Sequence, residues 1–329
     1  MEDRKKILGA NIFWVVLIFI NLGSSLIIGQ VTNDTTVSII TSQLSIILTM
    51  AVYLLVTKQN PLKLLRFKTF HLGSFFLVIL LAVCVVPMTS LINAISMLFA
   101  SNVVAGTLTD ITNGGLFPAL LLMAVLPAFV EECTFRGVIM GSYATGGRPV
   151  KAIVFSAIVF GLMHMNFNQM CYAVFMGLVF GAVVEATGSI FSSMTMHFCI
   201  NGFSTLVTWA LPRMIEYLKK VLPSGETAAL ADSLEASNEA LTTEALLNTI
   251  FSILPVALIA AVLACLLLKA IAKLNGNEDK WKLWLKKDYK EDREAVPKVR
   301  IFDIPYAIAA VLCLIICVLN ELALKMMGM

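Results

Sequence analysis

The sequence predicts an all-α fold, a polytopic bundle of about eight or nine transmembrane helices. Apolar residues make up 59% of the 329 residues, charged residues only 14%, and the mean hydropathy is +0.88. Soluble proteins average roughly 45–50% apolar and about 25% charged residues. Apolar stretches long enough to cross a bilayer, about 20 residues each, recur along the chain. These observations exclude a soluble enzyme, a nucleic-acid binder, a secreted disulfide module and a disordered chain.

The candidate spans follow one another with little interruption. We expect them at 10–29, 36–57, 72–99, 116–144, 150–167, 169–187, 189–210, 250–272 and 304–325. The first lacks a small-x-small cleavage site, so it is interpreted as a helix and not as a signal peptide. The breaks at 166–168 and 187–189 are short, which predicts antiparallel neighbouring helices.

Basic residues predict the orientation of the bundle. They occur before the first span, after the second, after the fourth and after the eighth, whereas segments 30–35 and 100–115 contain no Lys or Arg. Cytoplasmic loops carry the excess of Lys and Arg. We therefore expect the N-terminus in the cytoplasm and, with nine spans, the C-terminus outside.

Two polar segments divide the apolar chain. Segment 222–248 is acidic and is interpreted as an extracytoplasmic insertion, and segment 273–303, with Trp281 and Trp284, as an amphipathic helix on the inner leaflet. The expected organisation is N-terminal helices at 1–114, a core at 115–210, a polar loop at 211–249 and C-terminal helices at 250–329. Seven scattered cysteines without a Cys-x-x-Cys pair are expected to act as small apolar residues, without disulfides.

Charged residues inside an apolar span are the most informative feature of the sequence. Span 116–144 contains Glu131, Glu132 and Arg136. A charge at the centre of a span costs roughly 2.5–3.5 kcal/mol, so such residues are expected to be paired and functional. Glu132 and Arg136 are four residues apart and can form an ion pair. Glu131 points about 100° away and needs a partner on another helix, a proton or water.

Three polar residues on later spans are expected at a similar depth. His164 lies in span 150–167, and His197 and Asn201 lie one turn apart in span 189–210. Counted from the basic end, Glu131 and His164 are both about 21–22 Å along their helices, His197 about 12 Å and Asn201 about 18 Å. The third histidine, His71, begins a span near the inner interface and is interpreted as an interfacial polar residue.

A carboxylate and two imidazoles suit the activation of water. They could act directly, as a general base and its orienting partner. Glu131, His164 and His197 could instead bind zinc, which lowers the pKa of a bound water to about 7. Asn201 and one histidine could hold the oxyanion of a tetrahedral intermediate. The His-Glu-x-x-His and Gly-x-Ser-x-Gly signatures are absent, and Cys133 has no histidine on its own helix face.

These residues resemble the motifs of a known family. Glu131-Glu132-x-x-x-Arg136, Phe160-x-x-x-His164 and His197-x-x-x-Asn201 are similar, in order, to those of the CPBP intramembrane proteases. The group includes type II CAAX prenyl endopeptidases, lysostaphin-resistance proteins and bacteriocin-immunity proteins, and the resemblance covers about 115–205. It implies a helical-bundle peptidase whose site lies within the membrane and opens toward the cytosol. By the same resemblance, Glu131 and His164 activate water, His197 and Asn201 stabilise the oxyanion, and Glu132 and Arg136 support the site. Members are commonly called metalloproteases, so zinc is a possible cofactor.

The resemblance leaves the substrate open. Eukaryotic members cut prenylated tails, but the breadth of the family favours a bacterial cell membrane and a membrane-associated peptide or protein substrate. Two alternatives stay open: an immunity or scaffold protein of the same fold with dispensable catalysis, and a proton-coupled transporter. The latter predicts inverted repeats, which the sequence does not show.

The sequence also predicts how the site is reached. Pro127 is expected to kink its helix just before the glutamates. Together with helix tilt, this kink predicts a conical, water-filled pocket that opens toward segments 145–151 and 273–303, on the cytosolic side. Gly137 and Met140 would then lie along the route to Glu131.

Overall fold

The computed structural model describes residues 2–145, 149–221, 242–279 and 300–327. In these ranges the chain is helical, with short turns between helices and no strand. The long helices are α1 (Glu2–Val31), α2 (Thr35–Thr57), α4 (Leu72–Ser96), α9 (Pro149–Leu162), α10 (Phe167–Thr187), α11 (Ile190–Val221), α13 (Thr243–Leu274) and α15 (Ile304–Met326). The shorter helices α3 (Pro61–Leu64) and α5 (Val103–Asn113) lie between long ones. The predicted all-α fold is confirmed.

The fourth span is one rod built from several helical segments. It runs through α6 (Leu116–Leu120), η1 (Leu121–Val125), α7 (Leu126–Glu131), η2 (Glu132–Ile139) and α8 (Met140–Ala144), in which η1 and η2 are π-helical. A π-helical turn widens the helix and is frequently found at functional sites. Here the two π segments flank the turn that contains Pro127 and Glu131.

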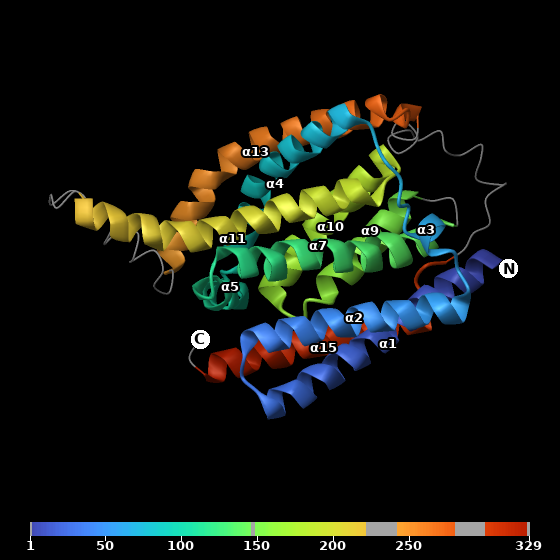
Figure 1. Cartoon of the computed structure of the whole chain (residues 1–329), viewed down its shortest axis with the longest axis horizontal. Coiled ribbons are helices and arrows are strands. Elements are labelled where there is room, and N and C mark those ends of the chain that lie inside the picture. Colours follow the sequence, from blue (N-terminus) through green and yellow to red (C-terminus); the bar gives the residue numbers. More distant parts are fainter. Residues whose placement is uncertain (1, 146–148, 222–241, 280–299, 328–329) are drawn as a thin grey trace.

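Among the described residues, seven helical spans are long and apolar enough to cross a membrane: α1, α2, α4, the 116–144 rod, α10, α13 and α15. Helix α9 has only 14 residues, and α11 is made more polar by His197, Asn201 and several hydroxyl side chains. Both still run beside the seven in the bundle (Figure 1). Many large side chains on the outer surface are apolar, such as Leu26, Leu55 and Ile259. The protein is an integral membrane protein.

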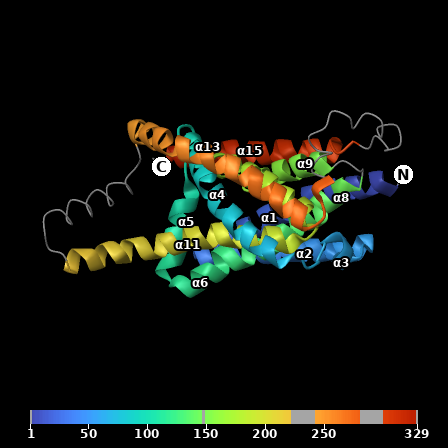
Figure 2. The same ribbon diagram turned by 90° about the horizontal axis from the view of Figure 1, so that it is seen from above.

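The helices form two packed groups that meet around the 116–144 rod. Helices α1, α2 and α15 lie together, and α13 packs along α4 (Figures 1 and 2). Helices α9 and α10 form an antiparallel pair between these groups, as expected from the short break at 166–168. The two marked termini lie at opposite ends of the bundle. The acidic segment 222–248 and the amphipathic segment 273–303 lie largely outside the described residues.

Local sequence explains where the helices begin and end. Asp34 accepts hydrogen bonds from the first amides of α2, and Asn166 caps α10 in the same way through the amide of Gln169. Gly188 ends α10 with φ of 74°, a left-handed conformation that glycine adopts without strain. His71 caps α4 through the amide of Gly73, so it has a local structural role. All seven cysteines are free, as expected.

Candidate active site

The pair Glu132 and Arg136 is buried in the centre of the bundle. The two side chains are 0% and 1% exposed, and Glu132 Oε1 lies 3.1 Å from Arg136 Nη1. The guanidinium stacks over the rings of Phe160, at 4.2 Å, and Phe180, at 5.0 Å. A desolvated cation over an aromatic face is stabilised by about 2 kcal/mol or more. The ion pair expected from the four-residue spacing is present, and two aromatic rings support its cation.

Glu132 also binds a histidine of another helix. His197 Nδ1 lies 3.0 Å from Glu132 Oε1, and its ring stacks on Phe180 with centroids 5.0 Å apart. An ionised carboxylate can only accept, so Nδ1 donates to it and Nε2 is the ring nitrogen left for other partners. Sequence reasoning missed this contact because nothing in the sequence shows which helix faces Glu132.

Glu131 faces the other way, as its helical position predicts. Its side chain is 16% exposed, and Oε2 lies 3.9 Å from His197 Nε2. The two adjacent glutamates therefore lie on either side of one imidazole. Glu132 holds the ring from the buried side, and Glu131 meets it from the side of a cavity.

His164 is oriented by its own helix. Its Nδ1 lies 2.8 Å from the carbonyl oxygen of Phe160, and its ring packs edge-on against the Phe160 ring. A carbonyl can only accept, so Nδ1 carries the proton and Nε2 keeps its lone pair in the neutral ring. The Phe160-x-x-x-His164 spacing thus places the carbonyl that accepts from the imidazole one helical turn before the histidine.

The turn after His164 is held from the last helix. Met165 has a left-handed backbone, with φ of 51°, and its carbonyl accepts a hydrogen bond of 2.9 Å from Asn320 of α15. Glu321, next on α15, accepts from the amide and hydroxyl of Ser101, and Ser101 in turn accepts from Asn166. A helix far along the chain therefore fixes the turn that carries His164.

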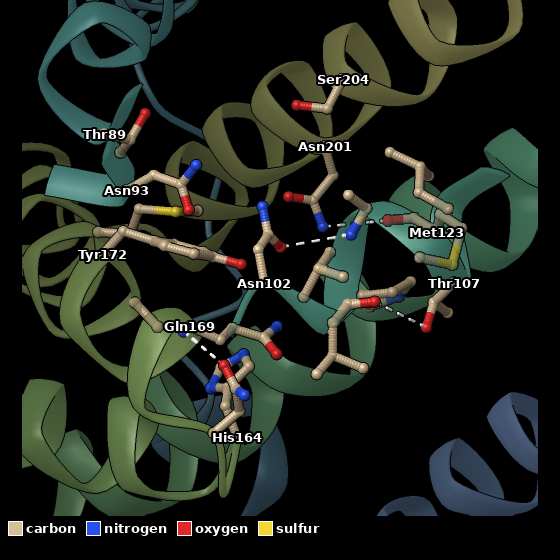
Figure 3. Close-up of a pocket in the computed structure, with 18 of the residues that line it drawn as sticks. Thr89, Asn93, Asn102, Thr107, Met123, His164, Gln169, Tyr172, Asn201 and Ser204 are labelled. Atoms are coloured by element: carbon tan, nitrogen blue, oxygen red, sulfur yellow. Dashed lines mark hydrogen bonds between the residues drawn. The ribbon is translucent and has the colours of Figure 1, made fainter. Parts of the chain in front are cut away.

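Asn201 satisfies a carbonyl beside Pro127. Proline has no N–H and cannot donate to the carbonyl four residues earlier, which belongs to Met123. Asn201 Nδ2 donates to that oxygen at 3.0 Å (Figure 3). One amide proton of Asn201 is therefore used for structure, and the other remains for a ligand.

The four predicted catalytic residues line one cavity. Glu131, His164, His197 and Asn201 border a space of about 750 Å³, within the usual 300–1,000 Å³ of ligand pockets. Figure 3 shows amide side chains of Asn93, Asn102 and Asn201 gathered around the same space. Glu132 and Arg136 do not line the cavity, and the supporting role expected of them stays a prediction.

The expected route to the cavity is wrong. Gly137 and Met140 are buried, and the segment around α3 packs on this face of the rod. A Cβ atom on Gly137 would meet Leu65 Cδ2 at 2.3 Å, and one on Gly141 would meet the Leu64 carbonyl at 3.1 Å. The small residues of the rod therefore allow α3 and Leu65 to pack closely against it. These two elements close the end that Gly137 and Met140 were expected to leave open.

The donor atoms of the site include groups that commonly bind metal ions. Two imidazoles held at Nδ1 with Nε2 left over are typical metal ligands, and Glu131 adds a carboxylate. However, among the described residues no three His, Cys, Asp or Glu side chains are grouped closely enough to hold an ion. The three side chains are therefore not grouped as zinc ligands in the described part of the chain, and zinc binding stays a prediction.

The site therefore consists of a buried ion pair, two oriented imidazoles and a carboxylate that faces one cavity within an all-α integral membrane bundle. The family model described as "Type II CAAX prenyl endopeptidase Rce1-like" matches residues 113–203. This segment carries all three motifs, so the match confirms the resemblance to the CPBP intramembrane proteases. Neither the curated proteins nor the solved structures gave a match.

Proposed function

We propose that the protein is an intramembrane endopeptidase that hydrolyses a peptide bond of a membrane-associated substrate with water activated by Glu131 and His164. Residues 113–203 match a family model of CAAX-type prenyl endopeptidases, which supports the proposal. The observation that carries the proposal is that Glu131, His164, His197 and Asn201 line one cavity. Each imidazole is also fixed through Nδ1, so that Nε2 is the nitrogen available for chemistry.

In the proposed first step, water lies between the Glu131 carboxylate and His164 Nε2. Glu131 removes a proton while the water oxygen attacks the carbonyl carbon of the scissile bond. General-base assistance of this kind contributes about 10²–10⁴-fold. His164 accepts the second hydrogen of the water as a hydrogen bond and so aims its lone pair.

The tetrahedral intermediate needs donors for its oxyanion. Asn201 offers the amide proton that Met123 does not use. His197 can donate from Nε2 only when its ring carries both protons, because Nδ1 already donates to Glu132. Glu131 Oε2 holds the proton taken from the water and lies 3.9 Å from that Nε2, so it can pass the proton to His197. When the tetrahedral intermediate collapses, this one proton goes to the leaving amine, and His197 and Glu131 return to their starting states.

Comparative membrane proteomics tests the proposal. Cells with the wild-type chain are compared with cells that carry Glu131→Gln, which keeps the shape of the side chain and removes the base. We expect an uncleaved protein to accumulate in the variant while the amount of the variant chain stays normal. A matched control is Glu2→Gln, a surface carboxylate paired with Lys6. An unchanged proteome and an intact cellular phenotype in Glu131→Gln would instead favour an immunity or scaffold role.

A further inference from the structure

The cavity lies at one end of the bundle. Its lining comes from the later turns of α4, from α5, from the turn at 163–166 and from the end of α15. Parts of α2, of the 116–144 rod, of the first half of α10 and of the middle of α11 complete it. Val103, Ala105 and Ser204 line the cavity and are exposed, so the space opens at this end. Helix α5 lies toward the end where the C-terminus is marked, whereas α3 and the N-terminus lie at the other (Figures 1 and 2).

The opposite end is closed by contacts between distant segments. Arg66 pairs with Glu185, and the hydroxyl of Ser189 donates to the carbonyl of Lys68. Leu65 is 5% exposed and packs on Gly137. These contacts join the α2–α4 connection to the α10–α11 turn, beneath the site.

The charges are distributed unequally between the two ends. The closed end holds most of the Lys and Arg in the described part of the chain, namely Arg4, Lys5, Lys6, Lys58, Lys63, Arg66, Lys68, Lys151, Lys269, Lys273 and Arg300. The cavity end holds Arg213, Lys219, Lys220 and Lys325, of which Lys220 pairs with Glu216 and Lys325 with Glu321. The excess of basic residues marks the cytoplasmic side of a membrane protein. By this criterion the closed end is cytoplasmic.

We propose that the site takes its substrate from the non-cytoplasmic side of the membrane, as an extended, uncharged internal peptide segment. This inference rests on the proposed function for the chemistry, but its geometric part does not. The closed basic end and the open cavity end together place the mouth of the cavity away from the cytoplasm.

The wall of the cavity sets the class of peptide. Within the described lining Glu131 is the one carboxylate, and there is no Lys or Arg. A terminal carboxylate would find no cation to pair with, and such pairing is the usual means of anion recognition. Amide and hydroxyl side chains such as Asn93, Asn102 and Thr107 instead offer donors and acceptors that suit peptide groups.

A buried carboxamide without a partner supports a peptide ligand. Gln43 of α2 lines the cavity, is 8% exposed, and its Oε1 has no hydrogen-bond partner in the described structure. An unsatisfied buried acceptor costs about 1–3 kcal/mol. A backbone N–H of the substrate would satisfy it. Residues 113–203, which match the family model, do not include Gln43.

Cysteine accessibility tests the direction of opening. Single cysteines are placed at Ser204, which lines the cavity, and at Leu206, two residues further on the same helix and outside the lining. A third at Lys151 reports on the closed end. Each is made in a background without the seven native cysteines and treated with a membrane-impermeant maleimide, in intact cells and in inside-out vesicles.

We expect Ser204→Cys to be labelled in intact cells, Leu206→Cys to stay unlabelled, and Lys151→Cys to be labelled only in inside-out vesicles. Labelling of Ser204→Cys from the vesicle side alone, or from neither side, would overturn the proposal. The same pattern should appear in a Glu131→Gln background, because labelling needs no proteolysis. If labelling follows this pattern but no substrate accumulates, the direction of opening stands and the proposed function fails.

The substrate provides a second readout. We expect the cleavage site of a protein that accumulates in Glu131→Gln cells to lie in an internal segment on the non-cytoplasmic side. A site within a cytoplasmic segment, or at a free C-terminus, would contradict the proposed class of peptide even if the protein is a true substrate.

Discussion

The carboxylate of Glu132 holds the imidazole of His197 from its buried side, with Oε1 3.0 Å from Nδ1. The same oxygen lies 3.1 Å from Arg136 Nη1. One acidic oxygen thus connects a buried cation on its own helix to a site residue on α11. Its neighbour Glu131, on the opposite side of that ring, is left to face the cavity.

Removing the Glu132 carboxylate should destabilise the protein as well as inactivate it. Glu132→Ala leaves Arg136 buried without a counter-charge, which costs roughly 3–5 kcal/mol. We expect a clear fall in yield and in the thermal unfolding temperature in detergent. Glu131→Gln is the matched variant, one residue away and facing the cavity, and its unfolding temperature should stay close to wild type. The reverse pattern in the two variants would exchange their roles.

Asn201 and Pro127 should be energetically coupled through the Met123 carbonyl. Asn201→Ala removes the donor to that oxygen and should cost about 1–3 kcal/mol. Pro127→Ala supplies a backbone N–H that can donate to the same oxygen, so Asn201→Ala should cost less in that background. A double-mutant cycle on thermal unfolding should give a coupling of about 0.5 kcal/mol or more. Ser204→Ala, which does not contact Met123, should be additive with Pro127→Ala; equal coupling for both pairs would refute the interpretation.

Gly177 should be the more sensitive of two helical glycines. A Cβ atom there would lie 2.8 Å from Ala157 Cα, on the backbone of α9, the helix that carries Phe160 and leads into His164. Forcing these helices apart typically costs about 1–3 kcal/mol. A Cβ atom on Gly23 of α1 would have nothing within 4 Å, so Gly23→Ala should be neutral or stabilising by up to about 1 kcal/mol. Unfolding temperatures that fall equally for both variants would show that the close approach to Ala157 does not determine the effect of substituting Gly177.

Replacing Gln43 should lower activity without lowering stability. Gln43→Leu replaces an unsatisfied buried carboxamide by an apolar side chain of similar length, so the unfolding temperature should stay level or rise. If Oε1 accepts from the substrate backbone, kcat/KM should fall about 2- to 10-fold, the equivalent of one neutral hydrogen bond. Ile39→Leu, on the same helix and also in the lining, is the control and should change neither property. A destabilised Gln43→Leu with unchanged kcat/KM would remove the proposed contact.

Much of the fold and of the site was predictable because the relevant spacings are local. Four-residue separations put Glu132 beside Arg136 and the Phe160 carbonyl beside His164. Helix geometry alone turns Glu131 away from the Glu132–Arg136 pair. Short breaks between spans predicted the antiparallel pair α9 and α10. Depth counting placed Glu131 and His164 at a common level, and both line the cavity.

The remainder depended on packing between segments far apart in the sequence. The direction of opening is set by Leu65 lying on Gly137, a contact across more than 70 positions that no periodicity reveals. The hydrogen bond from Asn201 to the Met123 carbonyl could not be predicted, because the sequence does not show that α11 packs against the turn containing Pro127. The sequence predicted a span at 189–210, and α11 extends it to Val221, although His197, Asn201 and several hydroxyl side chains lower its hydropathy.

The hydrogen bond from Asn320 to the Met165 carbonyl spans 155 positions of the chain, and this separation has a consequence for biosynthesis. Chains are made from the N-terminus at about 5–20 residues per second, so α15 leaves the ribosome about 8–30 s after the His164 turn. During that interval Glu131, His164 and His197 have all been synthesised, but the turn that orients His164 still lacks its hydrogen bond from Asn320. The core that carries these residues is thus assembled in an incomplete state, and it is completed only when α15 is inserted into the membrane.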